Sequence, residues 1–133
     1  MQNFIEKLFN ILSPITLFVG RTLLGLYFVW PGVMKFFHWE GHIAMMEKHH
    51  MIMIPVLLAT AAVVQIFLGS ALILNRLVPF AALILAGLVI LININLHDFW
   101  NFPGEMQNFV KNMAIFGGLL VLSAFSWKTR PQQ

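Results

Sequence analysis

Long apolar runs separated by short polar connections dominate the 133-residue chain. Four runs are long enough to cross a hydrocarbon core about 30 Å thick, since an α-helix rises about 1.5 Å per residue. The pattern therefore predicts an all-α integral membrane four-helix bundle with up-down topology. We expect residues 1–133 to form one domain, with membrane spans at about residues 14–36, 51–74, 79–96 and 105–127.

The first residues have a different pattern. Residues 2–12 alternate with helical period, with Phe4 on the apolar side and Lys7 on the polar side. This predicts a short N-terminal amphipathic interfacial helix, lying in the plane of the membrane surface. Ser13-Pro14 is typical of a helix N-cap followed by its first residue, so we expect the first span to begin there.

Composition narrows the function. Apolar residues make up 59% of the chain and charged residues 10%, which indicates that lipid surrounds most of the surface. The absence of cysteine excludes disulfides, thiol redox relays and iron–sulfur ligation by this chain. No haem, flavin or nucleotide motif is visible in the sequence. Redox chemistry would need a bound cofactor or a partner subunit, so we expect an accessory subunit rather than an independent enzyme.

Charges predict how the chain crosses the membrane. Basic residues are scattered singly and form no basic face, which argues against nucleic-acid binding. The end of the bundle that carries both termini has the larger basic excess, so the positive-inside rule predicts cytoplasmic termini in a bacterial-type inner (plasma) membrane. Its charged residues are Glu6, Lys7, Arg76, Lys128 and Arg130; the opposite end has Lys35, Glu40, Glu47, Lys48, Asp98, Glu105 and Lys111.

Each span places small and polar residues on one helical face. The glycines fit close helix contacts that need no ligand; they are Gly25, Gly32, Gly69, Gly87, Gly117 and Gly118. The carboxamides of Gln65, Asn93 and Asn95 fit either interhelical hydrogen bonds or a ligand site. Arg21 either extends to the interface or faces the bundle interior, where a charge is costly without a function.

The ends of the spans suggest a site. Lys35, His97, Asp98 and Lys111 lie at similar depth in an up-down bundle and could meet there, with Asp98 neutralising one lysine. A positive pocket would result, and Phe99, Trp100 and Phe102 would form its rim. It would suit a planar, oxygen-bearing ligand such as a quinone or an aromatic acid. An ordinary interfacial salt-bridge network is the alternative. The predicted ligand-binding set is Arg21, Lys35, Gln65, Asn93, His97, Asp98, Trp100, Lys111 and Asn112; no catalytic residue is predicted.

The connection between the first two spans, residues 37–50, is rich in histidine. Imidazole and nearby methionine thioethers suit copper or zinc. Solvated surface histidines explain the pattern more simply, so no metal site is predicted. The alternative metal ligands are His38, His42, His49 and His50.

The order and spacing of several motifs resemble the DoxX family. They are Arg21-x-x-x-Gly25 and Gly32-x-x-Lys35, Gly69 with Leu74-Asn75-Arg76, His97-Asp98-Phe99-Trp100, and Lys111-Asn112-x-Ala114-x-x-Gly117-Gly118-Leu119-Leu120. The resemblance, over about residues 15–127, implies a small four-helix inner-membrane protein. It also implies an association with quinol-linked oxidation of sulfur compounds and with membrane redox complexes. Gln65 departs from the glutamate that family members often carry there, and it cannot titrate.

Three functional hypotheses follow. The first is a redox-associated subunit that binds a quinone-like or small aromatic ligand and works as a homo-oligomer or with an oxidoreductase partner. The second is a non-catalytic small-molecule binder or transporter, with Arg21 and Lys111 as anion contacts, or an assembly factor. The third is a scaffold whose polar residues only hold the helices together.

Overall fold

The computed structural model describes residues 1–131, which are helical almost throughout. In chain order the elements are α1 (Gln2–Phe37), α2 (Trp39–Lys48), α3 (Ile54–Ile73), α4 (Val78–Leu96), the 3-10 turn η1 (Pro103–Glu105) and α5 (Met106–Lys128). The described residues contain no β-strand, and four helical segments are long and apolar enough to cross a membrane. The prediction of an all-helical membrane protein is therefore confirmed.

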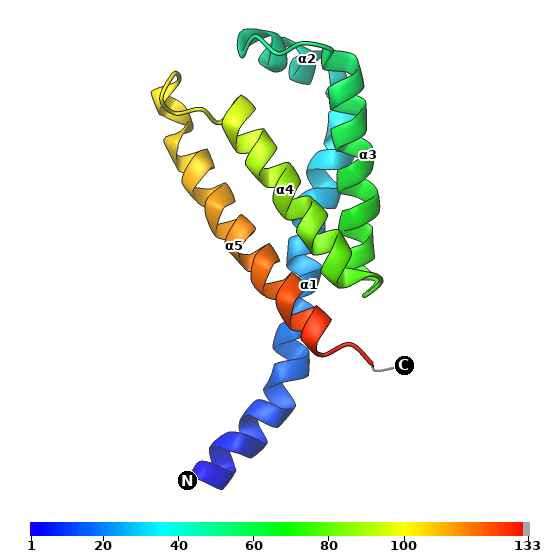
Figure 1. Ribbon diagram of the computed structural model, residues 1–133, viewed down its shortest axis with the longest axis vertical. Helices are drawn as coiled ribbons and strands as arrows, with labels where there is room; N and C mark the ends of the chain where they lie inside the picture. The colour runs from blue at the N-terminus through cyan, green and yellow to red at the C-terminus, as the bar shows by residue number, and fades with distance from the viewer. Residues whose placement is uncertain (132–133) are drawn as a thin grey trace.

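Two helix pairs make up the molecule. α1 lies along α3, α4 lies along α5, and α3 joins the pairs through its contact with α4 (Figure 1). The pairs meet near the α3–α4 turn and diverge toward the end that carries α2 (Figure 1). The larger apolar core fills the region where they meet; its buried residues are Phe28, Leu72, Val78, Ala81, Ala82, Leu85, Ala86, Val89, Leu119 and Leu122. A smaller core beneath α2 consists of Met46, Ile54 and Leu58.

Glycines set the distance between α1 and α3. A Cβ atom added to Gly25 would lie 2.6 Å from the carbonyl oxygen of Gly69, and one added to Gly69 would lie 2.8 Å from the carbonyl oxygen of Gly25. Gly32 makes a similar approach, with its added Cβ 3.1 Å from the carbonyl oxygen of Ala62. These separations leave no room for a side chain, so the prediction of close helix contact is confirmed for these three glycines.

The same prediction is wrong for the other three glycines that the sequence placed on these helical faces. An added Cβ on Gly87, Gly117 or Gly118 would meet no atom within 4 Å. The reason is the arrangement in pairs: these faces of α4 and α5 point away from the packed interfaces.

The predicted break at Ser13-Pro14 is also wrong. α1 is one continuous helix of 36 residues with Pro14 inside it. Proline removes one backbone donor, and the hydroxyl of Ser13 donates a hydrogen bond to the carbonyl oxygen of Phe9, 2.6 Å away. The first twenty residues are all exposed, and this part of α1 projects beyond the rest of the molecule (Figure 1). The expected amphipathic segment is thus the first part of α1 and not a separate helix.

Tight turns fix the ends of α2 and α3. After α2, His50 adopts a left-handed backbone with φ 59° while the N–H of Met51 bonds to the carbonyl oxygen of Met46. Asn75 ends α3 in the same way, with φ 57° and an Arg76-to-Ala71 hydrogen bond. This pairing of a left-handed residue with a long backward hydrogen bond is the Schellman motif. The first turn directs the chain from α2 back against the start of α3.

Candidate functional site

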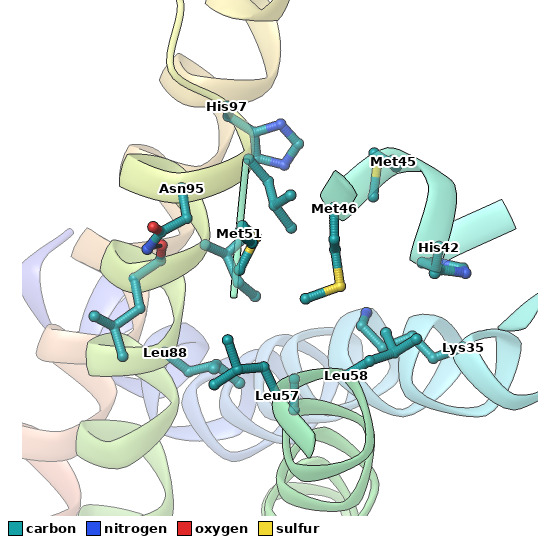
Figure 2. A pocket seen from close by; sticks show the side chains of 14 residues that line it. Lys35, His42, Met45, Met46, Met51, Leu57, Leu58, Leu88, Asn95 and His97 are labelled. Carbon is teal, nitrogen blue, oxygen red and sulfur yellow. Dashed lines mark hydrogen bonds between the residues drawn. The ribbon is translucent and has the colours of Figure 1, made fainter. Parts of the chain in front are cut away.

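A pocket of about 330 Å³ lies where the two helix pairs diverge. Its walls come from the end of α1, from α2 and the residue after the turn, from the first turns of α3 and from the last turns of α4. The Lys35 ammonium and the Met46 thioether point toward the same space (Figure 2). The lining residues are Lys35, His42, Met45, Met46, Met51, Leu57, Leu58, Ala61, Leu88, Leu91, Ile92, Asn95, Leu96 and His97.

The lining is polar at one end and apolar along its depth. Lys35 and His97 come from the ends of α1 and α4, and His42 comes from α2, whereas Ala61 and Leu88 lie well inside α3 and α4. The ten residues from Leu88 to His97 are separated by nine helical rises, which correspond to a depth of about 13 Å along α4. Such a pocket is suited to a molecule with one polar end and an apolar body.

Two of the predicted ligand-binding residues, Lys35 and His97, line this pocket together. The other members of the predicted set, Arg21, Gln65, Asn93, Asp98, Trp100, Lys111 and Asn112, are not among its lining residues. The single convergent cluster expected from the sequence is therefore divided among separate places.

Asn93 and Asn112 belong to a closed hydrogen-bond network in the bundle interior. The hydroxyl of Tyr27 donates to Oδ1 of Asn112 at 2.6 Å, and Nδ2 of Asn112 donates to Oδ1 of Asn93 at 2.9 Å. Nδ2 of Asn93 then donates to the carbonyl oxygen of Phe109 at 3.1 Å. The network joins α1, α4 and α5, and the two asparagines are at most 5% exposed. Asn93 thus has the interhelical role that its carboxamide allowed, and Asn112, which the sequence suggested only as a ligand-binding residue, shares that role.

Arg21 lies far from the pocket along α1. Its Nε donates to the carbonyl oxygen of Leu72, 2.8 Å away, near the C-terminus of α3. Helix C-termini carry free carbonyl groups and partial negative charge, so a guanidinium is favourable there. Arg21 thus has a structural partner within the protein.

Lys111 and Trp100 are exposed rather than enclosed. The Lys111 ammonium lies 5.9 Å from the centre of the Tyr27 ring, on the surface of α5. Trp100 is 55% exposed and packs edge-on against Phe99 and Phe109. The predicted aromatic rim is therefore absent from the pocket: Phe99 and Trp100 pack against Phe109 of α5, and Phe102 packs against His49.

Histidines and acids pair at the loop end of the molecule. Nδ1 of His97 lies 2.7 Å from Oε2 of Glu105, and Nδ1 of His49 lies 2.9 Å from Oδ1 of Asp98. The expectation that Asp98 neutralises a lysine is therefore wrong, since its partners are His49 and Asn101. The short turn after α2 brings His49 to Asp98, a pairing that spacing along the chain does not reveal.

The pKa of Asp98 reflects these partners. Burial, the largest single cause, raises the pKa of this carboxyl group. Hydrogen bonds from Asn101, from the backbone N–H of Asp98 and from His49, together with the charge of His49, outweigh it. The pKa of Asp98 consequently lies below its ordinary value of 3.8. The ionised carboxylate thus holds the α2–α3 connection against the α4–α5 loop.

The four histidines of the alternative metal site do not point to one centre. Nδ1 of His42 lies 2.9 Å from the carbonyl oxygen of His38, and His49 is engaged by Asp98. His38 and His50 are exposed. Among residues 1–131, no group of three or more His, Asp or Glu side chains is arranged to hold a metal ion.

Gln65 is buried at the α1–α3 contact. It is 4% exposed, and its Oε1 has no hydrogen-bond partner among the described residues. It lies one helical turn below Ala61, which lines the pocket. Its position beside Gly32 explains why the side chain is enclosed by helices.

Sequence reasoning missed Tyr27 and most of the apolar pocket wall. Tyr27 is the single tyrosine of the chain, and a tyrosine hydroxyl within an apolar span needs a partner, which was a usable signal. The wall residues gave no such signal, because Leu57, Leu88 and their neighbours look like any lipid-facing or core positions.

The family model described as DoxX matches residues 16–98, more than half of the chain. The chain belongs to the DoxX family. Comparison with curated proteins and with solved structures found no match. The DoxX match includes Lys35, all of α2 and α3, and His97, so it covers every lining residue of the pocket. It ends before α5, which holds the motif from Lys111 to Leu120 noted in the sequence.

Proposed function

We propose that this DoxX-family protein is an accessory membrane subunit that binds a quinone-like or small aromatic ligand in the pocket between its helix pairs. The observation that carries this proposal is the combination of a mostly apolar cavity with Lys35 and His97 at its polar end. Binding sites for small molecules typically combine apolar walls with a few polar groups that fix orientation. A carbonyl oxygen on the ring would accept a hydrogen bond from Lys35, while the ring and its substituents contact Leu57 and Leu88.

A partner oxidoreductase would supply the redox step in this proposal. The chain contains no cysteine, and its buried asparagines are engaged by Tyr27 and by the backbone of Phe109. The alternative of an anion transporter that uses Arg21 and Lys111 has less support. Arg21 is bonded to Leu72, and Lys111 is exposed on α5.

The membrane arrangement is part of the same proposal. The four long helices would cross a bacterial-type inner membrane in alternating directions as one domain, with both termini in the cytoplasm. The first part of α1 extends past the level at which Arg21 meets the end of α3, and its apolar side chains are exposed. Because α1 is continuous, placing this part along the inner membrane surface, where an amphipathic helix is stable, would need a bend between it and the span.

Filling the pocket tests the binding proposal. Ala61→Phe places a ring in the pocket, whereas Ala114→Phe adds the same group on an exposed position of α5. Both variants and the wild type would be placed in phosphatidylcholine nanodiscs and titrated with a short-chain ubiquinone, with quenching of tryptophan fluorescence as the readout and empty nanodiscs as the blank. We expect saturable quenching in the wild type and in Ala114→Phe, and its loss in Ala61→Phe. Equal quenching in all three would contradict the proposed site.

A further inference from the structure

Lys35 is a cation without a counter-ion in the pocket. The ion pairs among residues 1–131 are His49 with Asp98 and His97 with Glu105, and neither involves a lysine. No carboxylate of the described residues therefore lies within 4.0 Å of the Lys35 nitrogen. Lys35 is also only partly exposed, so water solvates it incompletely.

The other polar lining groups cannot neutralise this charge. His42 contacts the carbonyl oxygen of His38, His97 contacts Glu105, and Nδ2 of Asn95 donates to the carbonyl oxygen of Leu91. None of the three carries negative charge, and every remaining lining residue is apolar. A charge in an apolar environment is costly unless it is paired, so the pocket favours a partner that brings an anion.

We propose that the ligand carries an acidic group, such as a carboxylate, which pairs with the Lys35 ammonium while its apolar body fills the space toward Leu57, Ala61 and Leu88. This inference rests on the proposed ligand pocket and names the class of compound it takes: an apolar acid. A neutral carbonyl accepts a hydrogen bond from Lys35 but leaves its charge uncompensated, whereas a carboxylate makes the stronger, charge-assisted bond.

The size of the pocket limits the body of this acid. Its volume of about 330 Å³ is at the small end of the range of ligand sites. One ring with a short chain, or one short acyl chain, fits; the body of a two-chain lipid does not. An anionic lipid could still place its phosphate at Lys35 with only part of one chain inside, and the experiment must separate these two sources.

A matched pair of compounds tests the charge requirement. 4-Hexylbenzoate and 4-hexylbenzamide share the same ring and chain and differ in charge at neutral pH. Binding of each to wild-type protein in phosphatidylcholine nanodiscs would be measured by equilibrium dialysis, with empty nanodiscs subtracted. We expect the acid to bind about tenfold more tightly than the amide, as a hydrogen bond between charged partners implies.

Variants assign this preference to Lys35. Lys35→Met should reduce it to less than about twofold, and Lys35→Arg should keep it. Lys48→Met is the control, because it removes the same charge from the exposed end of α2 outside the pocket lining. Equal binding of acid and amide by the wild type would overturn the inference but leave the proposed pocket intact. Failure of both compounds and of ubiquinone to bind would overturn the pocket itself.

Measurements with an anionic lipid identify the source of the acidic group. The dialysis would be repeated in nanodiscs containing phosphatidylglycerol. If phosphatidylglycerol weakens binding of the acid to wild type and Lys35→Arg, but not the residual binding to Lys35→Met, a lipid phosphate reaches Lys35. Acid binding that is unaffected by phosphatidylglycerol would show that a free acid is the occupant. Either result supports an acidic group at this position.

Discussion

The two polar regions within the bundle differ in how completely the protein satisfies them. The network of Tyr27, Asn93 and Asn112 lies in the interior, and each side chain in it is bonded to another part of the protein. The pocket at the α2 end holds Lys35, which has no carboxylate partner among the described residues. Both regions arise from polar residues on otherwise apolar helices. Polarity alone therefore does not separate a structural group from a candidate binding group. The difference is that a structural group has its bonding partner within the chain, and a candidate binding group does not.

The largest effect is expected from breaking the closed network. Asn93→Leu removes the acceptor for Nδ2 of Asn112 and the donor to the carbonyl oxygen of Phe109. Leaving such groups buried and unpaired should lower the free energy of unfolding by about 2 kcal/mol. Chemical unfolding in mixed micelles, followed by circular dichroism, measures this value.

The control for that variant is Asn95→Leu. Asn95 is exposed, and its side chain bonds only to the carbonyl oxygen of Leu91 on the same helix, so little change in stability is expected. Equal destabilisation by the two substitutions would mean that the interhelical network contributes nothing specific.

A smaller, pH-dependent effect is expected at the contact between the two loops. Asp98→Asn should cost about 1 kcal/mol at neutral pH, because the ionised carboxylate accepts hydrogen bonds from His49 and Asn101. The pKa of folded Asp98 lies below 3.8, so its stabilisation is present above that value and is lost as the pH falls through the folded-state pKa. The difference in melting temperature between wild type and variant should therefore shrink in acid.

Glu47→Gln provides the comparison for this titration. Glu47 is exposed on α2 and forms no ion pair among the described residues, so its removal should give a flat difference across the same pH range. A stability difference for Asp98→Asn that grows as the pH falls would contradict the assigned direction of the pKa.

The smallest effect, and one of opposite sign, is expected from Lys35→Met without ligand. Replacing an unpaired, partly buried cation with an apolar chain of similar length should leave stability unchanged or raise it by up to about 1 kcal/mol. Thermal unfolding in phosphatidylcholine nanodiscs measures this. A marked loss of stability would indicate that Lys35 has a structural partner, and the contrast between the two polar regions would then fail.

Particular residues show how far the sequence could be interpreted. Asn93 was identified as buried and polar from its helical face, but its bonds to Asn112 and Phe109 depend on how α4 and α5 pair. Lys35 and His97 were both expected at one end of the bundle, and they do share a pocket. Lys111 was expected beside them from depth alone. Depth does not fix rotation about the helix axis, and α5 turns Lys111 to the outside.

The sequence alone determined the helices and their lipid environment, because apolar runs of this length satisfy their backbone hydrogen bonds only as helices within a membrane. It also indicated close helix contacts at glycines, which Gly25, Gly32 and Gly69 make, but the pairing of α1 with α3 came from the tertiary structure. Only the tertiary structure decided which polar groups meet, because that depends on helix rotation and on the turn after α2. That turn places His49 against Asp98, and α2 then closes one side of a pocket whose lysine is left without a protein counter-ion.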